Sequence, residues 1–217
     1  MIYIENVFIC IAVPLIFAVL CADKHSRPGF AFFIAGMGMC LLSAYINTFF
    51  AGYFGADMLQ ATVELVPAIE ETMKILPLLF FMLVFQPGQK EAQSAVLFVA
   101  AGFATFENVC YLIENGTSPF LFLLMRGFGT GAMHIVCGAI IGYGLLYVWE
   151  RPWLKAAGTF GLLCIAITFH ANYNLLLSIG GAVQTVGLLI PVFTVITGIV
   201  TSRLLWSKLP DYSKHSE

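Results

Sequence analysis

Residues 60–85 read QATVELVPAIEETMKILPLLFFMLVF. The stretch is long enough to cross a bilayer, because a spanning helix needs about 20 mostly apolar residues. Its middle nevertheless holds Glu70, Glu71 and Lys74. A charge at the centre of a membrane helix costs roughly 2.5–3.5 kcal/mol on insertion scales. The stretch therefore predicts a membrane helix with an ionisable cluster at mid-depth.

The whole chain has the composition of a membrane protein. Of its 217 residues, 60% are hydrophobic and only 10% are charged, whereas a soluble domain averages about 25% charged residues. Such a chain cannot cover a core with polar surface, so lipid is the expected solvent. The net charge of −2 comes with no basic stripe, and we expect no nucleic-acid partner. The six cysteines lie in apolar stretches without a C-x-x-C pair, which indicates packing residues.

Seven apolar segments are candidates for membrane spans: 3–21, 30–54, 60–85, 94–115, 119–149, 156–179 and 183–206. The first follows Glu5 rather than a basic region and ends without a small-residue cleavage site, so we expect a retained span and not a signal peptide. The short connections leave no room for a soluble domain. We predict an all-α, polytopic transmembrane helix bundle of about seven spans, with residues 1–217 forming one transmembrane domain.

The placement of lysine and arginine predicts the orientation. With the N-terminus outside, the inside segments hold eight of the ten cations and the outside loops hold none. The eight are Lys24, Arg27, Lys90, Arg151, Lys155, Arg203, Lys208 and Lys214. We therefore expect the N-terminus outside and the C-terminus in the cytoplasm.

Ionisable and amide side chains recur at a similar depth in four successive spans. They are Glu70, Glu71 and Lys74, then Glu107 with Asn108, then His134, and finally His170 with Asn174. At a rise of 1.5 Å per residue these groups share one layer near the midplane. Four antiparallel helices could bring them together in one internal site. Burying so many polar groups without a function would cost too much stability.

Local spacing adds detail to this layer. Glu70 and Glu71 lie four and three residues before Lys74, so either can pair with it. Arg126, near the start of its span, is expected to reach the outer interface or to pair with Glu114. Each feature also has a structural explanation, since a Glu–Lys pair can lock helices and a membrane histidine can bond neighbouring helices.

Two further patterns lie on the fourth and fifth spans. Tyr111 shares one helix face with Glu107 and Phe103, at a spacing of four residues. A ridge of glycines lies near the face of His134 and would allow close approach of another helix. The ridge comprises Gly127, Gly131, Gly138 and Gly142. Packing alone is sufficient to explain these glycines.

Carboxylates and imidazoles in a water-accessible pocket suit hydrolysis. A glutamate can take a proton from water, and a histidine can ligate a metal or donate to an oxyanion. Glu107, His134 and His170 would also fit a catalytic zinc site with one open position. The chain has no H-E-x-x-H, no G-x-S-x-G and no membrane aspartyl pair. Zinc-dependent chemistry and chemistry by glutamate without any cofactor both fit this set.

Four motifs stand in order on successive spans. They are E-E-x-x-K at Glu70–Lys74, F-x-x-x-E at Phe103–Glu107, H-x-x-x-G at His134–Gly138 and H-x-x-x-N at His170–Asn174. Over residues 60–175 this order and spacing resemble the PrsW-type intramembrane proteases, which in turn resemble the CAAX endopeptidase and Abi membrane proteases. The CAAX group has E-E-x-x-x-R and F-x-x-x-H, where this chain has Lys74 and Glu107.

The resemblance implies a hydrolase of the bacterial cell membrane. Its substrate would be a membrane-anchored protein such as an anti-sigma factor, cut within the lipid bilayer in regulated proteolysis. By motif match, Glu70 and Glu71 would be the catalytic carboxylates, with Glu107, His134 and His170 completing the site. Lys74, Asn108, Tyr111 and Asn174 would support them.

Three other kinds of protein also fit parts of the pattern. A proton-coupled transporter needs ionisable groups at the midplane, but the chain shows no internal repeat. A b-type haem protein could use His134 and His170 as axial ligands, although Glu107 at the same depth argues against it. A non-catalytic immunity or scaffold protein could keep the fold without the chemistry.

Overall fold

The structure is a computed structural model, and it describes residues 3–206. Within them every regular element is helical, which confirms the all-α class. The elements are α1 (Ile4–Cys21), α2 (Arg27–Phe54), α3 (Met58–Gln60), the π-helix η1 (Ala61–Leu65), α4 (Val66–Phe85), α5 (Gln89–Asn115), α6 (Phe120–Trp149), the 3₁₀ helix η2 (Pro152–Leu154), α7 (Lys155–Ile179) and α8 (Gly181–Trp206). The expected segment 60–85 is thus built from three consecutive helical pieces, with a π-helical turn before the glutamates.

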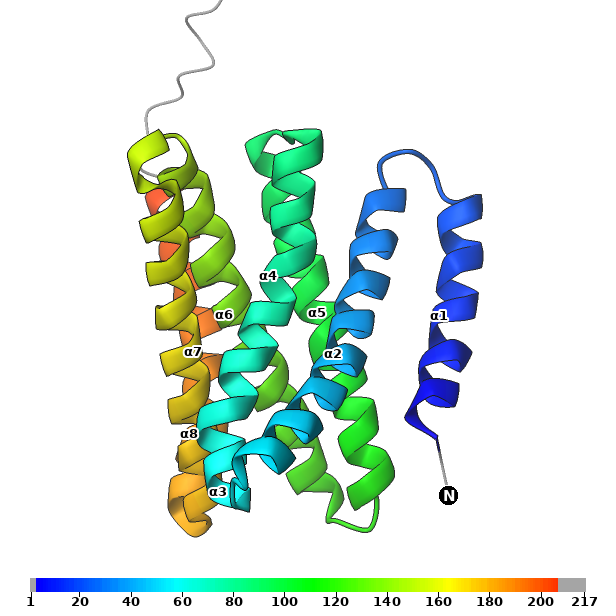
Figure 1. Ribbon diagram of the computed structural model, residues 1–217, viewed down its shortest axis with the longest axis vertical. Helices are drawn as coiled ribbons and strands as arrows, with labels where there is room; N and C mark the ends of the chain where they lie inside the picture. The colour runs from blue at the N-terminus through cyan, green and yellow to red at the C-terminus, as the bar shows by residue number, and fades with distance from the viewer. Residues whose placement is uncertain (1–2, 207–217) are drawn as a thin grey trace, which may run out of the picture.

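Six of the described helices are long and apolar enough to cross a membrane, so the chain is a multi-pass membrane protein. They are α1, α2, α5, α6, α7 with η2, and α8. The remaining long helix, α4, carries Glu70, Glu71 and Lys74, which lower its hydropathy. It nevertheless runs through the bundle beside α2, α5 and α7 (Figure 1). The polar cluster therefore explains why α4 differs from the other six.

The helices do not pack in sequence order. α1 lies at one edge of the bundle and α7 and α8 at the other, while α2 runs diagonally across it towards α3 (Figure 1). α2 packs along α5, and the crossing requires two glycines. A Cβ atom added to Gly36 would lie 2.1 Å from the carbonyl oxygen of Val99, and one added to Gly102 would lie 2.0 Å from that of Phe33. This contact fixes α5, and hence Glu107, against the N-terminal hairpin.

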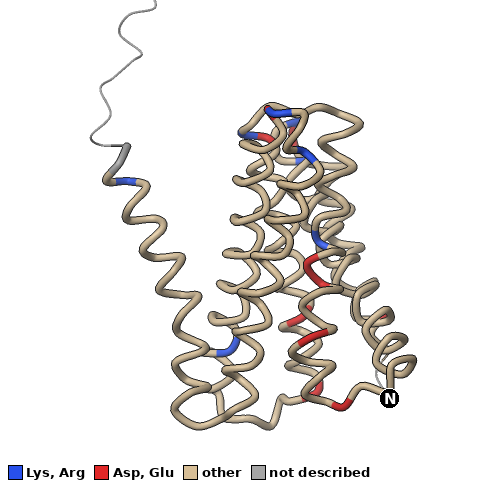
Figure 2. Tube along the Cα trace, turned by 60° about the vertical axis from the view of Figure 1, so that its left-hand side comes forward, with Lys and Arg blue, Asp and Glu red and all other residues tan. Residues whose placement is uncertain are grey.

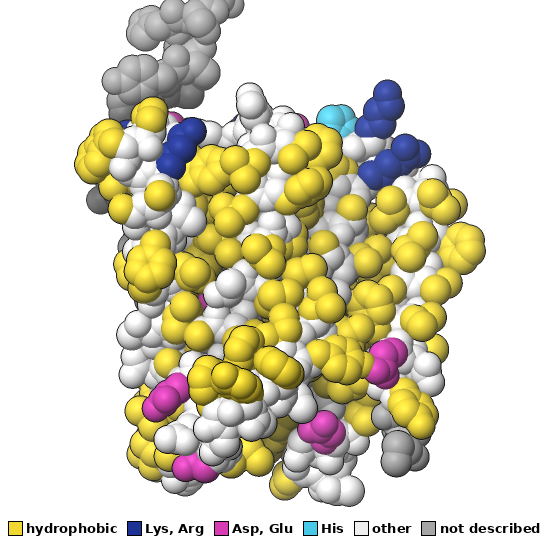
Figure 3. Space-filling view, viewed as in Figure 1, with side chains coloured by type: hydrophobic (Ala, Val, Ile, Leu, Met, Phe, Trp, Pro, Cys, Tyr) yellow, Lys and Arg dark blue, Asp and Glu magenta, His cyan; other side chains and the backbone are white. Residues whose placement is uncertain are grey.

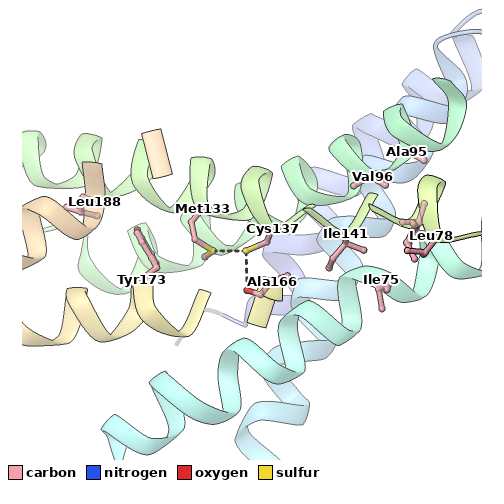
Figure 4. Packing of buried hydrophobic residues seen from close by; sticks show 12 residues of the cluster. Ile75, Leu78, Ala95, Val96, Met133, Cys137, Ile141, Ala166, Tyr173 and Leu188 are labelled. Carbon is pink, nitrogen blue, oxygen red and sulfur yellow. Dashed lines mark hydrogen bonds between the residues drawn. The ribbon is translucent and has the colours of Figure 1, made fainter. Parts of the chain in front are cut away.

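The main hydrophobic core lies among α4, α5, α6, α7 and α8 (Figure 4). Cys137 on α6 is fully buried there, with its Sγ atom 3.7 Å from the sulfur of Met133 and 3.5 Å from the carbonyl oxygen of Ala166. A buried, reduced cysteine in these contacts is a packing residue. The core positions α6 and α7, which carry the two buried histidines.

Charged side chains gather mainly at the ends of the bundle, whereas its flank is covered by hydrophobic ones (Figure 3). Most lysines and arginines lie at one end (Figure 2). This distribution matches the charge bias of the sequence, and a cytoplasmic position for that end stays a prediction. Lys208 and Lys214 lie outside the described residues.

Candidate active site

A π-helical turn precedes the two glutamates of α4. Such turns are rare and often lie at functional sites, because the i→i+5 pattern disturbs the regular ladder of hydrogen bonds. The side chain of Asn174 on α7 donates to the carbonyl oxygen of Thr62 in this turn at 2.9 Å. Pro67 follows in the first turn of α4, where the missing N–H is tolerated. The turn is therefore tied to α7 directly before the helix reaches Glu70.

Glu71 is the best-connected carboxylate of the cluster, and it is fully buried. Its Oε1 atom accepts from the Lys74 ammonium at 2.6 Å and from Nδ1 of His170 at 2.7 Å. Its Oε2 atom is buried and has no hydrogen-bond partner within the described residues. One oxygen is thus held by two donors while the other is free to accept a proton.

Lys74 also joins α4 to α6. Its Nζ atom lies 2.8 Å from Nδ1 of His134 and 5.0 Å from the ring centroid of Phe103. Because an ammonium group only donates, Nδ1 of His134 acts as the acceptor. The proton of this imidazole then lies on Nε2, which donates to the carboxylate of Glu107 on α5. The contacts therefore assign the tautomer of His134.

Arg126 completes the cluster on the side of Glu107. Its Nη2 atom donates to Oε1 of Glu107 at 3.1 Å and its Nη1 atom to Oδ1 of Asn108 at 2.6 Å. The guanidinium carbon lies 3.6 Å from the ring centroid of Tyr111. The expectation that Arg126 reaches the interface or pairs with Glu114 is wrong, because its side chain is only 12% exposed and is bonded to Glu107.

Arg126 is the site residue that the sequence reasoning missed. The sequence does contain a signal that Arg126 could reach Glu107, namely the distance of each residue from the loop that joins α5 and α6. Each lies roughly two turns from that loop, so the two are at a similar depth. A long arginine side chain can span the small remaining offset.

Most of the predicted residues lie in one connected cluster. Hydrogen bonds run from Arg126 through Glu107, His134, Lys74 and Glu71 to His170. Asn108 and Tyr111 contact Arg126, and Asn174 holds the π-helical turn. Glu70 lies beside the cluster, with its Oε2 atom 3.9 Å from Nε2 of His170. The structure thus joins α4, α5, α6 and α7 through these side chains, and their depth in a membrane stays a prediction.

A different set from the expected one offers ligand atoms for a metal ion. Within the described residues, Glu70, His134 and His170 each have a ligand atom within 4.8 Å of the others. The expected set had Glu107 in place of Glu70. The Glu107 carboxylate instead accepts from His134 and Arg126, an arrangement typical of the carboxylates that orient metal-bound histidines.

These features define a class of protein: a multi-pass membrane protein with a buried Glu, His and Lys cluster between its helices. The model of one family, described as PrsW family intramembrane metalloprotease, matches residues 27–200. The chain belongs to this family, and the match confirms the resemblance carried by the four motifs. Comparisons with curated proteins and with solved structures gave no significant match.

Proposed function

We propose that this protease cleaves a membrane-anchored protein, such as an anti-sigma factor, inside the plasma membrane of a bacterium. The observation that carries the proposal is the state of Glu71. Lys74 and His170 hold one of its oxygens, and the other oxygen is buried and unpartnered within the described residues. A fixed carboxylate with a free lone pair in a dry site is suited to act as a general base.

Space for a water molecule borders this base. A hollow of about 20 Å³ is lined by Glu71 and Lys74, and its remaining walls are apolar. One water needs roughly 10–15 Å³ and at least two polar partners. The Glu71 carboxylate and the Lys74 ammonium, which both line the hollow, offer two such partners.

The chemistry then follows from the contacts. Water loses a proton to Oε2 of Glu71, and its oxygen attacks the carbonyl carbon of the scissile peptide bond. The Lys74 ammonium stabilises the negative charge that develops on the carbonyl oxygen. The proton held by Glu71 passes to the amide nitrogen, which leaves as an amine when the C–N bond breaks.

The donor set also fits a zinc ion, which would agree with the family description. Oε2 of Glu70 is buried without a partner within the described residues. His170 donates through Nδ1 to Glu71, which leaves a lone pair on its Nε2 atom, 3.9 Å from Glu70. Glu70, His134 and His170 would hold the ion, with Nδ1 of His134 released from the Lys74 ammonium to face the metal. A bound zinc would polarise the scissile carbonyl as a Lewis acid.

Two carboxylates keep the histidines in place, whether or not the reaction uses zinc. Glu71 accepts from His170, and Glu107 accepts from His134. Each bond fixes one tautomer and one ring orientation. We infer that Glu107 acts through His134 and that Arg126 in turn holds Glu107.

Co-expression with candidate single-span substrates tests this function. Wild-type protein should release a new fragment whose ends map within the membrane segment of the substrate. Glu71→Gln should not release it. Glu64→Gln is the matched control, because Glu64 is exposed on the π-helical turn of the same segment. Release of the same fragment by Glu71→Gln, or by cells without the protein, would refute the proposal.

A further inference from the structure

A second cavity lies at the end of the bundle where the basic residues gather, away from the protease site. It has a volume of about 260 Å³ and is formed by the α1–α2 loop, α2, α4 and α5. Its polar lining consists of Lys24, His25, Glu91 and Ser94. Figure 3 shows basic side chains at this end, above the yellow flank of the bundle.

The lining has a cationic side and an anionic side. Lys24 and His25 come from the loop, and Glu91 comes from the first turn of α5. Oε2 of Glu91 accepts from the backbone N–H of Gly88 at 3.0 Å, which leaves its other oxygen available. No ion pair joins Lys24 to Glu91 within the described residues, although both line the same cavity.

The neighbouring charges are engaged elsewhere. Asp23 accepts from Ser26 and from the backbone of His25 at the start of α2, and the bonds from Ser26 hold the pKa of its carboxyl below the usual range. Arg27 donates to the backbone oxygen of Ala22 at 2.8 Å. Lys24, His25 and Glu91 therefore set the charge pattern inside the cavity.

The floor of the cavity is aromatic. Phe32 and Phe81 meet edge to face with centroids 4.8 Å apart, and Phe98 forms a third wall. Aromatic faces attract cations and also cover apolar chains. Phe98 is 43% exposed on the flank of α5, one of the helices able to cross a membrane. The cavity thus opens from a charged mouth onto a surface that lipid chains can cover.

We propose that this cavity binds the headgroup of a phospholipid that carries both a phosphate and an ammonium group, such as phosphatidylethanolamine. Lys24 and His25 face the phosphate. Glu91 and the phenylalanine rings face the ammonium, and the acyl chains run down the flank past Phe98. Because Phe81 belongs to α4, the bound lipid braces the helix that carries the catalytic glutamates.

Native mass spectrometry of the delipidated protein tests the proposal. The protein is titrated with phosphatidylethanolamine and with phosphatidylglycerol of the same acyl chains. Wild type should bind the former more tightly. Lys24→Met should weaken binding of both lipids about fivefold, since a lysine near a lipid surface contributes on the order of 1 kcal/mol. Glu91→Gln should remove the preference for phosphatidylethanolamine.

Two variants separate the cavity from the surface charge around it. Ser94→Phe keeps every charge and fills the cavity from an exposed position. It should therefore weaken the binding of both lipids by a similar factor. Lys90→Met removes one exposed cation at the same end, outside the lining, and should bind as wild type does. Wild-type affinity in Lys24→Met or in Ser94→Phe would overturn the proposal. Equal affinity of the wild type for the two lipids would overturn it as well.

Discussion

Arg126 on α6 donates to Glu107 on α5, with 3.1 Å between Nη2 and Oε1. The second oxygen of Glu107 accepts from His134, which lies about two turns further along α6. The carboxylate therefore bridges two residues of one neighbouring helix. This bridge sets both the rotation of α6 against α5 and the orientation of the His134 ring.

The bridge predicts a positioning role for Arg126. Arg126→Gln should lower the cleavage rate about 10- to 100-fold, because the loss of such outer partners typically costs that much. Arg126→Lys should recover part of the rate, since it keeps the charge but loses the two-pronged contact with Glu107 and Asn108. The measurement is the initial rate per amount of membrane-inserted protein.

A matched arginine gives the control for this prediction. Arg151 stacks on Tyr147 at 4.6 Å near the end of α6, in the same manner as Arg126 stacks on Tyr111. Arg151→Gln should leave the cleavage rate unchanged. A rate for Arg126→Gln equal to that of Arg151→Gln would contradict the positioning role.

Lys74 is expected to stabilise the fold as well as the reaction. Lys74→Met leaves Glu71 buried without its cation, and removal of one partner from a buried pair costs about 3–5 kcal/mol. The double variant Lys74→Met with Glu71→Gln should recover much of that stability, because no charge is then left unpaired. Thermal unfolding of the single and double variants in detergent measures the coupling. Additive losses would show that the two side chains do not interact.

Asn174 tests the importance of the π-helical turn. Asn174→Ala removes the bond to the carbonyl oxygen of Thr62, which should cost about 1 kcal/mol of stability and lower the rate by loosening the start of α4. Asn172→Ala is the control, since Asn172 is exposed and, among the residues that the structure describes, its side chain bonds only the carbonyl oxygen of Thr168 on its own helix. Equal cleavage rates for the two variants would show that the π-helical turn does not affect the reaction.

The sequence predicted the layer of the site because depth depends only on the position of a residue along its helix. Glu70, Glu107, His134 and His170 lie at matching depths, and the structure brings them together. The rotation of each helix depends on packing between distant segments, and the sequence does not show it. The preference of Lys74 for Glu71 over Glu70 is one such detail.

The sequence also does not show which helices pack against one another. α2 crosses α5 through Gly36 and Gly102, two glycines that no motif marks. The expected glycine ridge on α6 is only partly used. A Cβ at Gly142 would lie 2.5 Å from Val96, whereas Gly131 has nothing within 4 Å. Glycine spacing indicates a face that could pack closely, but the partner decides which part of the face does so.

Metal analysis distinguishes the two ligand sets. If Glu70, His134 and His170 hold zinc, purified protein should carry about one equivalent and chelation should stop cleavage. Glu70→Gln should then lose the metal. Glu107→Gln should retain it with about 10- to 100-fold weaker affinity, because an orienting carboxylate supports a ligand without binding the ion.

Loss of the metal in Glu107→Gln, with retention in Glu70→Gln, would instead favour the ligand set of Glu107, His134 and His170. Full activity in metal-free protein would instead leave the glutamates, histidines and Lys74 to carry the reaction without zinc. Metal content by mass spectrometry and the cleavage rate are measured on the same preparations. Glu64→Gln is the control, because Glu64 is exposed and does not belong to either ligand set.

The rate of substrate cleavage by purified Glu71→Gln, relative to wild type, tests the central claim most directly. Glutamine keeps the shape of the side chain and removes the basic carboxylate. Loss of a general base typically slows a reaction about 10²–10⁴-fold, and we predict a reduction of at least that order when the rate is divided by the amount of folded, inserted protein. Cleavage by Glu71→Gln at the wild-type rate would contradict the account.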